Sequence, residues 1–220
     1  FYLNSNLYNK RITPSSIDLI EYQPSSSLLD GLIKYKKKKI NIENYSLNEI
    51  WNNPNLKETE QQNLNSFFWL FSLDLKSSKK DTQNVLYQWI NINDRYNSKS
   101  WKVDIIGKRI IAWISNSRLT YEDGSIDYKE KFNSTIKKQI NHLINEIEAS
   151  ELINDKIIGC AAIILTGLSY PQNNNYLNNG LSLLKKLTKF SLDSDGFPKS
   201  RSIRQLIFYL KYFILIREWF

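Results

Sequence analysis

Three segments of this chain carry side chains that could do chemistry, and each lies at a turn before an expected helix. The first segment contains Trp101, Arg109 and Trp113. A tryptophan face stacks well on a sugar ring, and an arginine can hold a carboxylate through two parallel hydrogen bonds. These residue types favour contact with an acidic sugar. The alternative is that Trp113 belongs to the core and that Arg109 is a surface or paired side chain.

The second segment is the pair Asn154 and Asp155, which directly precedes the most apolar stretch of the chain. Both side chains are candidates for a site at the start of that helix. Asp155 is also an ordinary helix cap that interacts favourably with the helix dipole, and this role alone would explain it.

The third segment holds Asp195, Ser200 and Arg201 around a turn made by Gly196 and Pro198. Ser200 can cap the helix that follows. An arginine at a helix start is electrostatically unfavourable, so the sequence predicts either a structural pair between Arg201 and Asp195 or an anion contact.

Composition excludes several kinds of site. The single cysteine, Cys160, lies in an apolar stretch and is expected in the core, which rules out internal disulfides and zinc sites built from Cys and His. The single histidine, His142, lies off the apolar stripe of its helix and is expected to be exposed. The chain has no P-loop, dinucleotide fingerprint or nucleophile elbow. We therefore expect no cofactor and no metal.

The net charge of +8 is spread along the chain, with 23 Lys against 7 Arg. The dense run 34–39 is expected to be a solvated edge, with a polyanion contact as the alternative, and we expect no nucleic-acid partner. The apolar runs 157–168 and 206–216 are shorter than the roughly 20 residues of a membrane span. The first residues do not resemble an export signal.

Helical spacing of apolar residues dominates from about residue 45 onward. The clearest stripe is Phe132, Ile136, Ile140, Leu143 and Ile147, which step by four and three residues. Residues 1–44 are expected to be irregular, with short extended pieces at 17–22 or 32–42. We expect a short helix from Ser46 that carries Trp51, and helices at about 59–75, 81–92, 103–116, 128–149, 155–169, 176–190 and 199–220.

The helix expected at 155–169 has no polar face and should be buried on all sides. Its neighbours in sequence are amphipathic, which suits a double layer of inner and outer helices. The sequence therefore predicts an all-α fold of the toroid or solenoid type. The absence of a fixed-length repeat counts against the solenoid.

An ordered set of segments within residues 85–220 resembles the helical domain of heparinase II/III-like proteins, in particular their bacterial branch. The set consists of Trp101, Arg109–Trp113, Gln139–Ile140, Leu143, Ala161–Leu168, Gly180–Leu184, Asp195–Gly196, Ser200–Arg201 and Leu215–Arg217. The resemblance implies an incomplete (α/α) toroid of paired antiparallel helices over residues 45–220. It also implies a following β-sandwich domain as the partner of this domain.

Such proteins are polysaccharide lyases, so the resemblance implies an acidic polysaccharide as the substrate. β-Elimination needs a neutralised uronate carboxylate, a base for the C5 proton and an acid, typically tyrosine, for the leaving oxygen. By this resemblance Asn154 is the catalytic candidate, and the location would be the cell envelope or periplasm. The substrate-binding candidates are Trp101, Arg109, Trp113, Asp155, Asp195, Ser200 and Arg201.

This chain departs from the family pattern at two positions. Active members carry an Asn-His pair before the buried helix, where this chain has Asn154 and Asp155. They also carry a tyrosine shortly after the Asp-Gly turn, where this chain has Gln205. The resemblance is therefore compatible with a lyase or with a non-catalytic relative that binds glycans.

Two other functions remain open. A glycoside hydrolase built on an (α/α) toroid would use two of the carboxylates Asp104, Asp155 and Asp195, and an inverting pair would stand roughly 6.5–9.5 Å apart. A helical scaffold would have no enzymatic role. We also expect the chain to be a piece of a longer protein, because it has no Met and its last helix runs to Phe220 without a cap.

Overall fold

The computed structural model describes residues 2–24, 51, 55–73 and 78–220, and the regular elements of this part of the chain are helices. A single antiparallel bridge joins Leu192 to Pro198. The all-α prediction is therefore confirmed for the described residues.

In chain order the helices, with η marking 3-10 helices, are η1 (Tyr2–Asn4), α1 (Asn6–Ile12), α4 (Glu58–Ser66), η3 (Phe68–Ser72), α5 (Lys79–Ile92), α6 (Val103–Ser115), α7 (Ser117–Thr120), α8 (Ile126–Glu146), η4 (Ile147–Ala149), α9 (Ile153–Ser169), α10 (Asn174–Ser191) and α11 (Ile203–Trp219).

One expected helix, 59–75, is divided in two. Between α4 and η3, Phe67 adopts a left-handed backbone with φ of 55°, which a bulky residue seldom does. Its fully buried ring lies 5.3 Å from Trp51, 5.7 Å from Trp89 and 5.3 Å from Trp113, measured between ring centroids. Trp69 is a fourth neighbour, at 5.4 Å between ring centroids. Burial of the Phe67 ring among these four tryptophans accounts for the break in the helix.

Two helix caps also differ from expectation. Ser78, and not Asp81, caps α5, because its hydroxyl accepts a hydrogen bond of 3.2 Å from the Asp81 backbone N–H. Ser202, and not Ser200, caps α11. The helix expected from Ser46 and the run 34–39 lie outside the described residues, apart from Trp51, as does the extended piece at 32–42.

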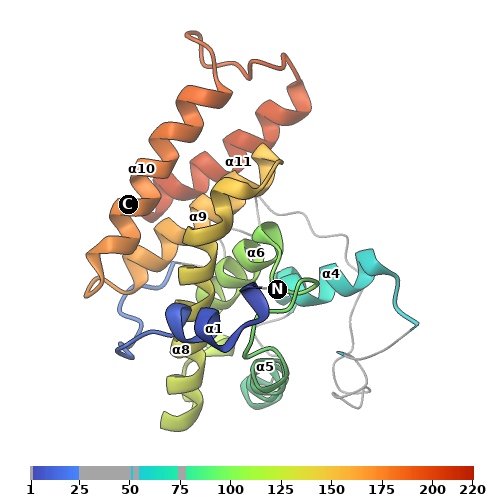
Figure 1. Cartoon of the computed structure of the whole chain (residues 1–220), viewed down its shortest axis with the longest axis vertical. Coiled ribbons are helices and arrows are strands. Elements are labelled where there is room, and N and C mark those ends of the chain that lie inside the picture. The colour runs from blue at the N-terminus through green and yellow to red at the C-terminus, as the bar shows by residue number, and fades with distance from the viewer. Residues whose placement is uncertain (1, 25–50, 52–54, 74–77) are drawn as a thin grey trace.

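The apolar helix α9 is at the centre of the molecule, with α6, α8, α10 and α11 packed around it (Figure 1). Every residue from Ile157 to Gly167 is buried, as predicted for a helix without a polar face. The antiparallel α10 approaches closely at two glycines. A Cβ on Gly167 would lie 2.6 Å from the Leu177 Cα, and one on Gly180 would lie 2.6 Å from the Ile164 Cγ1.

The N-terminal residues 2–24 are not wholly irregular, because residues 6–12 form α1. This segment lies along α8. Asn141 donates a hydrogen bond of 2.8 Å to the Ile12 carbonyl, and Lys137 forms an ion pair with Asp18. Residues 17–22 form no strand, although Glu21 N–H bonds the carbonyl at the end of α9.

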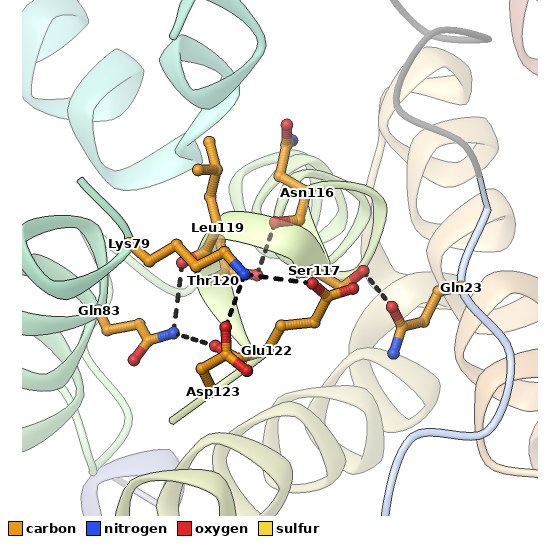
Figure 2. Close-up of polar contacts among 9 residues, drawn as sticks. All are labelled: Gln23, Lys79, Gln83, Asn116, Ser117, Leu119, Thr120, Glu122 and Asp123. Carbon is orange, nitrogen blue, oxygen red and sulfur yellow. Dashed lines mark hydrogen bonds and ion pairs between the residues drawn. The ribbon is translucent and has the colours of Figure 1, made fainter. Parts of the chain in front are cut away.

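A polar network fixes the turn between α7 and α8 (Figure 2). Lys79 on α5 reaches Glu122 at 3.4 Å and Asp123 at 2.7 Å. On the other side, Ser117 donates a hydrogen bond of 2.5 Å to Gln23. The turn thereby joins α5 and the N-terminal segment to the same part of the core.

Candidate functional site

A pocket of about 430 Å³ lies between α4, the end of α5 and the loop 93–100. Its size falls within the range of about 300–1,000 Å³ that small-molecule sites occupy. Among the described residues, the lining is mostly uncharged and polar, with Lys99 as its one charged residue and with two aromatic rings. The side chains that define its character are Asn4, Asn65, Asn93, Asn97, Gln61, Trp51 and Tyr96.

The pocket wall is held in place by hydrogen bonds behind it. Asn65 Oδ1 accepts from the Trp89 indole N–H at 2.8 Å, and Asn93 Oδ1 accepts from the Ser100 hydroxyl at 2.8 Å. Trp51 stacks on Phe67, and its buried indole N–H has no hydrogen-bond partner among the described residues. The indole N–H groups of Trp101, Trp113 and Trp219 are unpaired among the described residues in the same way, so this donor does not by itself indicate a ligand.

Arg109, a predicted substrate contact, is fully buried behind this wall. Its guanidinium donates to the Asn65 carbonyl at 2.7 Å, to the Ser100 carbonyl at 3.1 Å and to Gln139 Oε1 at 2.9 Å. It also lies 4.1 Å from the ring centroid of Trp89. Burial lowers the pKa of Arg109. The side chain therefore joins the end of α4 to the loop before α6, and it is paired rather than open to solvent.

Trp101 and Trp113 are also core residues in this structure. Trp113 is fully buried and stacks on Phe132, with ring centroids 5.3 Å apart. Trp101 is buried beside His142, at 5.2 Å between ring centroids. These positions agree with the alternative reading of the first segment, in which Trp113 belongs to the core.

The expectation that His142 is exposed is wrong. The ring is buried, and its Nδ1 lies 2.6 Å from the hydroxyl of Tyr8 on α1. Burial lowers the pKa of His142 to about 4. The prediction failed because α1 covers the side of α8 that carries no apolar stripe, and the sequence of α8 alone does not reveal this cover.

A group of charged side chains gathers where α6 and α9 begin and α11 passes. Lys108 pairs with Asp104 at 2.6 Å, with both side chains partly exposed. Burial raises the pKa of the Asp155 carboxyl, and the negative charge of Asp104 raises it further. The positive charge of Lys108 acts in the opposite direction and lowers it. Burial lowers the pKa of Lys211 on α11, and the positive charge of Lys108 lowers it further. The four groups therefore share one electrostatic environment.

Asn154 lies in the first turn of α9, directly before Asp155. It is half-buried, and its Oδ1 has no hydrogen-bond partner among the described residues. Asp155 also lies in that first turn, whose capping position is Leu152. The catalytic candidate implied by the resemblance is thus adjacent in sequence to Asp155, which belongs to the charged group with Asp104, Lys108 and Lys211.

The third predicted segment forms the turn between α10 and α11. Arg201 pairs at 2.8 Å with Asp193, and not with Asp195, which is exposed. The backbone N–H of Phe197 donates to Asp193 and lowers the pKa of that carboxyl. Ser200 is exposed and its hydroxyl bonds the side chain of Gln205. The structural pair expected for Arg201 therefore exists with a different partner.

The predicted residues thus lie in three separate places. The core contains Trp101, Arg109 and Trp113. The start of α9 carries Asn154 and Asp155, and the α10–α11 turn carries Asp195, Ser200 and Arg201.

The pocket was not predicted. Its asparagines carried no local signal in a chain as rich in Asn as this one, although the polar loop between 93 and 100 marked a break between two helices.

No family model, curated protein or solved structure matches the chain. In the part of the chain that the structure describes, no three His, Cys, Asp or Glu side chains are grouped so that they could hold a metal ion. Within the same part, none of the helices combines the length and the apolar character that a membrane crossing requires.

Proposed function

We propose that this chain is a glycan-binding helical domain of the heparinase II/III-like type, which holds an acidic polysaccharide in the pocket beside α4 and α5. The observation that carries the proposal is the lining of that pocket. Among the described lining residues, amide side chains and two aromatic rings surround one lysine, Lys99. Amides and hydroxyls bind sugar hydroxyls, and the lysine offers a positive charge to a uronate.

The arrangement of helices in this proposal is an incomplete (α/α) toroid. Its support is the buried helix α9, with α6 and α10 packed against it and α10 half exposed. A β-sandwich domain that follows the toroid would complete the protein, as the resemblance implies.

β-Elimination would take place outside this pocket, where Asn154 and Asp155 begin α9 and Asp104 pairs with Lys108. Asn154 and Lys108 would neutralise the uronate carboxylate, since each offers hydrogen-bond donors. Asp155, whose pKa is raised by burial, would accept the C5 proton as the base. The acid would come from another residue, because Gln205 cannot donate a proton as a tyrosine does.

The test is binding of uronic-acid oligosaccharides, with neutral oligosaccharides of the same length for comparison. The variant Gln61→Ala with Lys99→Ala removes two side chains from the pocket. We expect it to lower the affinity about tenfold or more, since a hydrogen bond to a charged group contributes roughly 1.5–3 kcal/mol. The matched control is Asn63→Ala with Lys80→Ala, two exposed side chains outside the pocket. Equal affinity of all three proteins would refute the pocket as the glycan site.

A glycoside hydrolase is the second candidate, and the proximity of Asp104 and Asp155 favours it. Two carboxylates with different environments can divide the roles of acid and base. The products distinguish the two reactions, because elimination leaves an unsaturated uronate that absorbs ultraviolet light and hydrolysis does not. Loss of activity in both Asp104→Asn and Asp155→Asn, without an ultraviolet signal in the parent, would identify the hydrolase. A protein that binds no glycan would instead be the helical scaffold.

A further inference from the structure

The turn between α10 and α11 exposes large apolar side chains that the described residues leave uncovered. Phe190 at the end of α10 is 70% exposed, Phe197 in the turn is 51% exposed, and Ile203 at the start of α11 is 74% exposed. Exposed apolar residues are common singly, but a concentration of them marks an interaction surface.

Helix α11 has two apolar faces and uses one of them inside the molecule. Tyr209, Tyr212, Ile216 and Trp219 are buried against the body. On the opposite side, Ile203, Ile207 and Leu210 follow one another at spacings of four and three, and all are exposed. We call these three residues the outer stripe. A helix that is apolar on both faces needs a second apolar partner.

The charges around the outer stripe are mainly basic. Lys189, Lys199 and Arg204 are exposed at this end of the two helices. Arg201 is paired with Asp193, which leaves Asp195 as the other acidic residue of the turn. An anionic partner would complement this surface, whereas a second copy of the chain would bring like charges together.

The position of this region leaves it accessible to a partner as extended as a membrane surface. The turn projects at one extremity of the molecule, far from α5 and α8 (Figure 1). The outer stripe lies on the side of α11 opposite its buried residues, and the pocket lies elsewhere in the chain. An exposed apolar stripe with basic residues near it is typical of a helix that lies in a membrane interface. We propose that the α10–α11 turn and the outer stripe dock onto the surface of an anionic lipid bilayer.

The experiment is co-sedimentation of the 220-residue chain with vesicles. Vesicles of phosphatidylcholine with phosphatidylglycerol are compared with vesicles of phosphatidylcholine alone. We expect binding to the anionic vesicles that is at least about tenfold tighter and that weakens as salt is added. The variant Ile203→Ser with Ile207→Ser should lose about tenfold or more of this affinity, because it removes two large apolar side chains from the interface.

The control variant is Ile126→Ser with Leu152→Ser, which removes two apolar side chains of similar exposure elsewhere. It should bind vesicles as the parent does, and neither variant should change glycan affinity. Equal binding to neutral and anionic vesicles, or equal binding of the two variants, would overturn the proposal. So would a parent that ignores vesicles but dimerises through Ile203 and Ile207, since the partner would then be a second copy.

Discussion

At the scale of single residues, Arg109 carries the clearest energetic consequence. Its guanidinium satisfies the carbonyls of Asn65 and Ser100 and the side chain of Gln139, all within the core. Arg109→Met would leave these acceptors unpaired. We expect the free energy of unfolding, measured by urea denaturation, to fall by about 3 kcal/mol. Each unpaired acceptor costs roughly 1–3 kcal/mol, and part of this cost is offset because the variant no longer buries a charge.

Arg109→Lys is expected to restore little of this loss. A lysine carries the charge but lacks the planar fork that reaches three acceptors at once. Arg118→Met, at an exposed position on α7, is the control and should change stability by less than about 0.5 kcal/mol. If Arg109→Met is as stable as the parent, the contacts of Arg109 do not hold the loop before α6.

His142 should make the stability of the protein depend on pH. Burial lowers its pKa from 6.5 to about 4 on folding, so the unfolded chain binds more protons between these values. The free energy of unfolding therefore decreases as the pH falls through this window, by about 2 kcal/mol between pH 7 and pH 5. Urea denaturation at the two pH values measures it. The variant His142→Gln should lose this part of the pH dependence, and an unchanged slope would show that other groups cause it.

At the scale of the elements, the crossing of α9 and α10 depends on Gly167. A Cβ there would meet the backbone of Leu177, which cannot move without separating the two helices. We expect Gly167→Ala to lower the free energy of unfolding by about 2 kcal/mol, since overpacking of this kind outweighs the gain in helix propensity. Asn179→Ala, exposed on α10, is the control and should be neutral or slightly stabilising. A stabilised Gly167→Ala would mean that the helices are further apart than described.

Periodicity predicted the helices well because the stripe on each one faces the same core. The Phe132–Ile147 stripe and the all-apolar α9 are buried as expected. Periodicity failed where a tertiary contact decided the backbone, as at Phe67, whose ring enters a cluster of tryptophans contributed by three other segments. It also described α11 as apolar without distinguishing the face against α9 from the outer stripe.

At the scale of the whole molecule, the candidate site was harder to predict than the fold. The pocket is made by residues from the N-terminus, Trp51, α4, α5 and the loop 93–100, which no local pattern connects. Trp101 and Arg109 were predicted to contact substrate, but Arg109 donates to the Asn65 carbonyl from inside the core and Trp101 is buried beside His142. Asp104, Asp155 and Asp195 were named together as candidates for a pair of carboxylates, and only the packing of α6 against α9 shows that Asp104 and Asp155 share an environment.

The attachment of the N-terminal segment to α8 provides a test of the whole assembly. Lys137 is a buried lysine whose ammonium pairs with Asp18, 119 residues away in sequence, and also donates to the Ser16 carbonyl at 3.2 Å. Asp18→Asn would leave a buried charge without its counterion. We expect a loss of about 3 kcal/mol in the free energy of unfolding, together with faster amide hydrogen exchange in residues 6–12.

Replacement of both partners separates the net contribution of the ion pair to stability from the cost of leaving one buried charge unpaired. In Lys137→Met with Asp18→Asn no buried charge remains, and an apolar side chain fills the space of the lysine stem. Most of the lost stability should return, because a buried ion pair is often no better than an apolar contact of similar volume. A double variant as unstable as Asp18→Asn alone would instead show that the lysine itself, through Ser16, holds the first 24 residues against the helical body.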